Sequence, residues 1–264
     1  MEHRSGPWGT PVKIAVLQCA AAGGCWATAE SRLGDALSVA SAAGCDLLVA
    51  PELMMPGYNC AQAHFDHARE FDALRRDLSA MAAEAGCALV TGCAEREGEA
   101  IYNTALAIGP NGEVLAHHRK RLLFGDMERA TFHKGSGASC LFEYGGRRFG
   151  LLICYEIEFP ELARDLARQG AEVFLVPTAN PEGYEHVQRY LLPARAHENG
   201  AFVVYANYCG TENGLTFGGQ SLVVGPDGEC ILSAGRTPAL LIGELPTLGV
   251  YPPGVLSTQL QDLS

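Results

Sequence analysis

The stretch CDLLVAPEL, at residues 45–53, has the pattern of a buried β-strand: an apolar run that ends at Pro51 and Glu52. A similar stretch, AEVFLVPTA, lies at residues 171–179, and a glycine that ends a predicted helix precedes each of them. KIAVLQC at residues 13–19 likewise matches FGLLIC at residues 149–154. This repetition predicts two related halves, half-barrels or half-sandwiches, built from one strand and helix unit.

Helices and strands alternate along the rest of the chain. Helical spacing covers residues 29–43, 65–85 and 160–168. A Pro-Asn-Gly turn at residues 110–112 joins two strand-like stretches and predicts a hairpin. Further strands are expected at residues 87–95, 203–208, 221–224 and 230–232. Because the repeated strands are apolar throughout, both faces of each sheet must be covered, which predicts an α/β fold.

The interior of the chain contains no stretch typical of a linker. We therefore expect a flexible N-terminal segment at residues 1–11, a single domain at residues 12–245 and a C-terminal tail at residues 246–264. The N-terminus lacks the basic and apolar segments of a secretory signal. No apolar run approaches the roughly 20 residues of a membrane span, so a cytoplasmic protein without a membrane partner is expected.

Charge and cysteine content narrow the class of protein further. The formal net charge is −11, which argues against nucleic acid and anionic membranes as partners. An acidic chain favours cationic small molecules by steering, although solubility alone also explains this charge. The ten cysteines are scattered and form no CxxC pair, which is typical of reduced thiols in a cytoplasm. No motif with the spacing of a metal site is present.

Chemically capable side chains follow four of the predicted strands: Glu52, Lys120, Cys154 and the segment 178–180. In α/β sheets, ligands bind outside the carboxyl ends of strands, so these groups are expected to share one pocket. Lys120 is suited to neutralise a developing oxyanion, but it also lies in the basic run HHRKR, where an exposed lysine is ordinary.

Cys154 lies between a strand and a predicted helix, where N–H groups and the helix dipole favour a thiolate. A buried structural cysteine explains the local pattern equally well. Glu52 is the better candidate for its base, because an apolar strand end raises the pKa of a carboxyl group. His117 and His118 are adjacent on a strand, so their side chains must point to opposite faces.

Taken together, these segments resemble the nitrilase superfamily of carbon–nitrogen hydrolases, whose hallmark is a Glu–Lys–Cys triad. The matching motifs are LLVAPELMMPGYN (47–59), HHRKRLLFGDMERATFHKG (117–135) and GLLICYEIEFPE (150–161), followed by VPTAN, ARAHENGAFVVYANYCG and GGQSLVVGPDGE. The similarity spans about residues 13–235, in the right order. It implies a four-layer αββα sandwich, which agrees with the internal repeat.

The resemblance also implies a role for each matching residue. Glu52 is the base, Cys154 the nucleophile, and Lys120 with the backbone N–H of Tyr155 binds the oxyanion. Glu128 matches a second glutamate that orients the lysine or the substrate. The family pattern requires no metal or organic cofactor, and its members often form dimers or larger homo-oligomers. Further substrate or oxyanion contacts are expected from Tyr58, Thr178, Ala179 and Asn180.

The resemblance is greatest to aliphatic amidases of the 5-aminopentanamidase and stereoselective-amidase type. It implies hydrolysis of a small carboxamide, with an ω-amino amide suited to the acidic chain. A nitrilase and an N-carbamoyl amidase would use the same triad. A thiol-rich redox-sensing or binding protein on the same scaffold is the non-enzymatic alternative. The chain departs from the family pattern at His118, Leu122, Glu156 and Pro193, and Pro193 is expected to kink or begin a helix.

Overall fold

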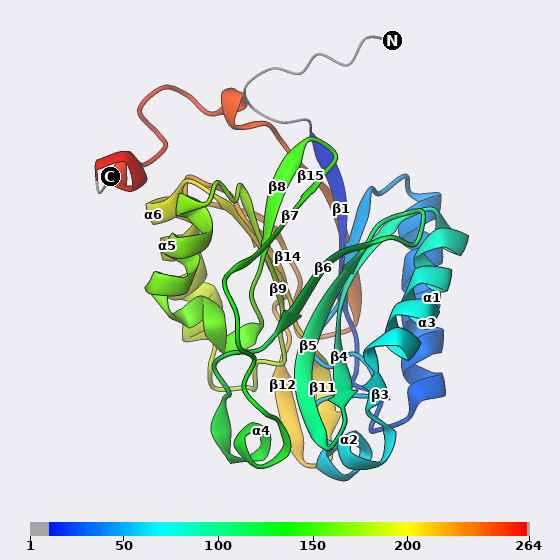
Figure 1. The fold of residues 1–264 in the computed structure, drawn as a ribbon. Helices are drawn as coiled ribbons and strands as arrows, with labels where there is room; N and C mark the ends of the chain where they lie inside the picture. The colour runs from blue at the N-terminus through cyan, green and yellow to red at the C-terminus, as the bar shows by residue number, and fades with distance from the viewer. Residues whose placement is uncertain (1–10, 263–264) are drawn as a thin grey trace.

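Two β-sheets packed face to face form the centre of the computed structural model, which describes residues 11–262 (Figure 1). Helices α1 (Trp26–Ala42) and α3 (Phe71–Ala85) cover the outer face of the first sheet. Helices α5 (Pro160–Arg168) and α6 (Leu192–Asn199) cover the second. This arrangement confirms the predicted αββα sandwich. Of the expected flexible N-terminal segment, residues 1–10 lie outside the described residues.

The two sheets have the same plan. In each, three central strands run parallel, and antiparallel strands flank them, one on one side and two on the other. The first sheet has the order β15 (Ala239–Leu245), β1 (Val12–Gln18), β2 (Leu47–Val49), β4 (Ala88–Glu97), β5 (Ala100–Ile108) and β6 (Val114–Arg119). The second has the order β7 (Cys140–Tyr144), β8 (Arg147–Leu151), β9 (Val173–Pro177), β10 (Phe202–Ala206), β13 (Leu222–Val224) and β14 (Cys230–Ser233). The repeat in the sequence thus corresponds to β1–β2 and β8–β9.

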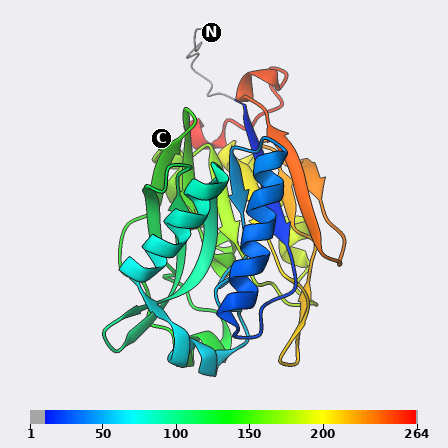
Figure 2. The ribbon, with the colours of Figure 1, turned by 90° about the vertical axis from the view of Figure 1, so that its right-hand side faces the viewer.

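Alternate residues of the apolar strands pack into different layers of the core, either between the two sheets or under the helices. On β2, Leu47 and Val49 pack into the core between the two sheets, while Leu48 packs under α1 and α3. All three are at most 1% exposed, and burial of each side chain contributes about 1.5–3 kcal/mol. Figure 2 shows α1 (blue) and α3 (cyan) in front of the sheet that they cover. The continuous apolar runs in the sequence are explained by this burial on both faces.

The predicted helix at residues 65–85 is wrong, because the structure divides it. Helix α2 (Ala61–His67) ends before Ala68, whose ψ of 135° is not helical, and β3 (Arg69–Glu70) then pairs in parallel with the end of β4. Helix α3 begins only at Phe71. No glycine or proline marks the break in FDHARE, and the apolar spacing fits either arrangement, so periodicity alone did not reveal it.

Pro193 lies in the first turn of α6, which confirms the expected helix start. A short π-helical segment, Val187–Leu191, leads directly into it. The hairpin of β11 (Cys209–Glu212) and β12 (Leu215–Gly218) was not predicted, nor were the strands β7 and β15 at the sheet edges.

The remaining elements are short. Helix α4 (Gly125–Thr131) follows β6, and a 3₁₀ turn at Cys154–Glu158 follows β8. The C-terminal residues include another 3₁₀ turn, Leu248–Val250, and helix α7 (Gln259–Asp262), from which Leu260 packs against the α5 and α6 layer. Within the described residues, no helix has the length and apolar character needed to cross a membrane.

Candidate active site

The four predicted strand ends meet at one place between the sheets. Glu52 follows β2, Lys120 follows β6, Cys154 follows β8 and Thr178 follows β9. The backbone N–H of Glu52 donates to the carbonyl oxygen of Thr178 at 3.3 Å, which joins the two halves directly. Gly92 of β4 permits this approach, because a Cβ there would overlap the backbone of Glu52 and Leu53.

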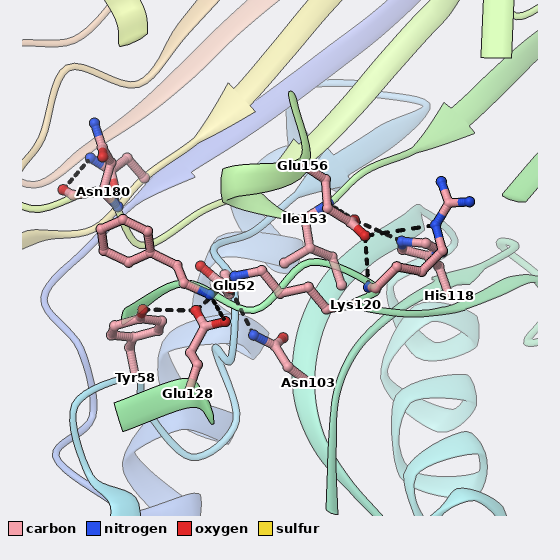
Figure 3. Close-up of polar contacts among 12 residues, drawn as sticks. Glu52, Tyr58, Asn103, His118, Lys120, Glu128, Ile153, Glu156 and Asn180 are labelled. Atoms are coloured by element: carbon pink, nitrogen blue, oxygen red, sulfur yellow. Dashed lines mark hydrogen bonds and ion pairs between the residues drawn. The ribbon is translucent and has the colours of Figure 1, made fainter. Parts of the chain in front are cut away.

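Lys120 lies at the centre of the cluster and is fully buried. Its Nζ is 2.6 Å from Oε1 of Glu52 and 2.7 Å from Oε1 of Glu128 (Figure 3). Its backbone N–H donates to the Asn103 carbonyl at 2.8 Å, which fixes where the side chain begins. Burial alone would lower the pKa of Lys120, but Glu128 and Glu52 outweigh that effect and raise it. The lysine therefore stays cationic inside the protein.

Glu52 uses only one of its two oxygens for hydrogen bonds. Oε1 accepts from Lys120 and, at 2.7 Å, from Nδ2 of Asn103. Oε2 is buried and has no hydrogen-bond partner among residues 11–262. Burial raises the pKa of Glu52 to about 7, and Lys120 opposes the shift. A carboxylate with one fixed and one free oxygen, and a pKa near neutrality, is suited to move a proton.

Glu128 and Tyr58 lie next to each other in this cluster (Figure 3). The Tyr58 hydroxyl donates to Oε1 of Glu128 at 2.8 Å, and the N–H of Phe124 donates to Oε2 at 2.9 Å. The loop that carries Tyr58 is held by Glu212 of β11, whose carboxylate accepts from the N–H groups of Tyr58 at 3.0 Å and Asn59 at 2.6 Å. The unpredicted hairpin thus supports the site from the second half of the chain.

Cys154 begins the 3₁₀ turn after β8 and has a φ of +46°. A non-glycine residue rarely adopts this conformation, and at a strand-to-helix turn it projects the side chain away from the sheet. Burial raises the pKa of the Cys154 thiol, Glu52 raises it further, and Lys120, Thr178 and Ala179 oppose the rise. This environment therefore favours the protonated thiol. As the second residue of the turn, Tyr155 has a backbone N–H with no partner inside that turn.

The segment 178–180 runs beside the cysteine, but its members differ. Thr178 and Ala179 are close enough to affect the pKa of Cys154. The side-chain amide of Asn180 instead donates to Oε1 of Gln188 at 3.0 Å and to the carbonyl of Tyr184 at 3.1 Å. Asn180 therefore braces the 181–188 loop, and its expected substrate contact stays a prediction.

A single family model covers this arrangement: one described as carbon-nitrogen hydrolase matches residues 13–251. The chain belongs to the carbon-nitrogen hydrolase family. It is a nitrilase-superfamily hydrolase of the amidase type, acting on carbon–nitrogen bonds other than peptide bonds. The predicted family and enzyme class are confirmed by this match.

Relatives of this carbon-nitrogen hydrolase include several amidases. It is 44% identical to a Pseudomonas protegens protein named "Hydrolase in pqqF 5'region", over 76% of this chain and 71% of that protein. It is 35% identical to an (R)-stereoselective amidase from a Pseudomonas species, over 89% of this chain and 85% of that protein. The structure of a cysteine-to-serine mutant of the Nesterenkonia AN1 amidase, from the nitrilase superfamily, matches with a TM-score of 0.88 at 39% identity, over 95% of this chain and 94% of that chain.

Sequence reasoning missed two supporting residues of this hydrolase. Asn103 lies on β5 and is fully buried, and a polar residue inside the apolar strand AIYNTALAI was a signal that could have identified it. Glu212 lies on a hairpin that was not predicted, so nothing indicated its partners. The structure contains no group of three or more His, Cys, Asp or Glu side chains arranged to hold a metal ion within residues 11–262.

Proposed function

We propose that this hydrolase is a cysteine amidase that converts a small aliphatic carboxamide and water into a carboxylate and ammonia. The observation that carries the proposal is the free Oε2 of Glu52 in a buried cluster with Lys120 and Cys154. Such a cluster supplies a base, a cation and a nucleophile in a space with little water, where electrostatic effects are strongest.

The reaction follows from the positions of these groups. Glu52 removes the proton of the Cys154 thiol as the thiolate attacks the amide carbonyl carbon. Lys120 and the N–H of Tyr155 stabilise the negative oxygen that forms. Glu52 then returns the proton to the departing nitrogen, so that ammonia leaves and a thioester remains. A water molecule, activated by Glu52, attacks the thioester, and the carboxylate leaves with the thiol restored.

The size of the acyl group is limited by burial, since Cys154 is only 7% exposed. Structural relatives support a short chain. Variants of the Nesterenkonia amidase have been described in complex with butyramide and with the acetamide moiety of fluoroacetamide added covalently at the active-site cysteine. The net charge of −11 further favours an amide that carries a distant amine.

Ammonia release from butyramide and 5-aminopentanamide tests the proposal, with Cys154→Ala as the inactive control. Intact-protein mass spectrometry of the trapped enzyme should show an acyl adduct on Cys154. Butyronitrile and N-carbamoyl amines test the other members of the family, because a carbamoyl substrate also releases carbon dioxide. Ammonia release by Cys154→Ala at the wild-type rate would refute the assignment. A faster reaction with butyramide than with 5-aminopentanamide would refute the preference for an amine.

A further inference from the structure

Glu156 is a buried carboxylate that takes no part in the proposed chemistry. It is fully buried and accepts three hydrogen bonds of 2.8 Å: from the N–H of Arg121, from the N–H of Ile153 and from Nε2 of His118. His118 is itself only 4% exposed. Figure 3 shows this carboxylate beside His118, with the side chain of Lys120 extending away from it toward Glu52.

Two of these donors are sequence neighbours of the candidate catalytic residues. Ile153 precedes Cys154, and Arg121 follows Lys120. The two backbone segments come from different sheets, since β8 leads to Ile153 and β6 leads to Arg121. A single carboxylate therefore connects the chain beside the nucleophile to the chain beside the lysine. Its hydrogen bond to Ile153 also restrains the backbone that holds Cys154 at a positive φ.

The charge of Glu156 fits this arrangement. Burial acts to raise the pKa of Glu156, but His118 and the two N–H donors lower it overall. The groups that face the carboxylate are His118 from β6 and the Arg121 side chain, whose Nε is 3.9 Å from Oε1. Oε1 faces Arg121 and Oε2 faces both Ile153 and His118, so both oxygens must be acceptors. A glutamine side chain has only one oxygen and cannot satisfy both sides.

We propose that Glu156, oriented by His118, is a positioning residue that sets the separation of Cys154 and Lys120 across the two sheets. This inference rests on the proposed amidase function. His118 and Glu156, both expected from the sequence to depart from the family pattern, are in direct contact. A displacement of about 1 Å between reacting groups lowers a rate by about 10²-fold, so small shifts here are expected to reduce kcat.

The experiment compares Glu156→Gln with a matched control, Glu95→Gln. Glu95 is also fully buried, and it accepts from His117 at 2.6 Å, from Thr104 at 2.7 Å and from Arg119. His117 and His118 lie on opposite faces of β6, so the two substitutions disturb the same strand from opposite sides. Both substitutions therefore replace a fully buried carboxylate that contacts a histidine of β6, whereas only Glu156 accepts from the backbone next to Lys120 and Cys154.

Two readouts separate positioning from folding. With butyramide, Glu156→Gln should lower kcat by about 10²-fold and change KM by less than about threefold, while Glu95→Gln keeps kcat within about twofold. The rate of Cys154 alkylation by iodoacetamide should fall at least about tenfold in Glu156→Gln, and its pH profile should move to higher pH, because Lys120 no longer stabilises the thiolate. This second readout remains valid if the enzyme proves not to hydrolyse butyramide.

The partner residue supplies a further test. His118→Gln keeps a donor for Glu156 and should retain most of the alkylation rate, while His118→Leu removes the donor and should resemble Glu156→Gln. The proposal is overturned if folded Glu156→Gln alkylates at the wild-type rate, or if Glu95→Gln loses as much kcat as Glu156→Gln. If Glu156→Gln does not fold, equal alkylation rates in His118→Gln and His118→Leu overturn it.

Discussion

Replacement of Lys120 by methionine removes the one cation that contacts both Glu52 and Glu128 within the described residues, at 2.6 and 2.7 Å. All three side chains are fully buried, so neither carboxylate gains water in compensation. Removal of one partner from a buried ion pair costs about 3–5 kcal/mol of the free energy of unfolding. For a chain of this length, that loss lowers the melting temperature by about 10 °C. The same change should lower kcat by at least about 10²-fold, because a donor to the oxyanion is lost.

The loss of stability should depend on pH in a defined direction. Burial already raises the pKa of Glu52 to about 7, and without the lysine that pKa must rise further. The folded variant then binds protons that the unfolded chain has released, so its stability falls as pH rises through this range. Urea unfolding at about pH 6 and about pH 8 should therefore show the larger deficit at the higher pH.

A double variant tests whether the unpaired carboxylates cause this loss of stability. The double variant Lys120→Met/Glu128→Gln removes one of the two carboxylates that the first substitution leaves without a cation. It should recover part of the lost stability but none of the activity. A deficit below about 1 kcal/mol at about pH 8 would refute the reasoning, as would a deficit that grows when the pH is lowered. Either result would mean that water or a conformational change compensates the carboxylates.

Other predictions concern the groups around Lys120. Because Glu52 must be ionised to act as a base, kcat/KM for butyramide should fall as pH decreases below about 7, as a pH–rate profile will show. Tyr58→Phe removes the hydroxyl that donates to Glu128 and should lower the free energy of unfolding by about 1–3 kcal/mol in urea titrations. Gly92→Ala forces the Glu52 turn away from β4 and should lower kcat by about 10²-fold in steady-state assays. Incubation with EDTA should leave ammonia release unchanged, since the proposed chemistry uses only side chains and backbone.

Much of the fold was predictable because its strands are buried on both faces. Runs such as LLV at β2 and VFLVP at β9 must pack against two layers, and their repetition indicated two equivalent halves. The strands at the sheet edges were harder to predict. Strand β15 pairs along the whole of β1, yet its register is determined by a partner more than two hundred residues away in the sequence. The break between α2 and α3 likewise depends on pairing of β3 with β4, which no local pattern encodes.

The candidate site was also predictable only in part. Glu52, Lys120 and Cys154 could be proposed because each lies within three residues of the end of a strand, where ligands bind in α/β sheets. The partners of their supporting residues could not be predicted from local sequence. Glu212 and Asn103 bind the site through contacts across 154 and 51 residues of sequence. Such contacts depend on the complete fold, and a lone buried polar residue in a strand indicates only that some partner exists.

The two halves of the sandwich contribute different parts of the candidate site, and two further carboxylates connect the halves beside it. Glu52 and Lys120 come from the first half, while Cys154 and Thr178 come from the second. The apolar core between the sheets is non-directional, so it holds the halves together without fixing their register to a fraction of an ångström. Hydrogen bonds, which are directional, must fix that register. Glu156 and Glu212, both from the second half, each accept N–H groups from first-half loops that carry site residues. We therefore expect substitutions at these two carboxylates to reduce activity more than apolar substitutions of equal cost in stability, because only the former change the distance between the halves at the site.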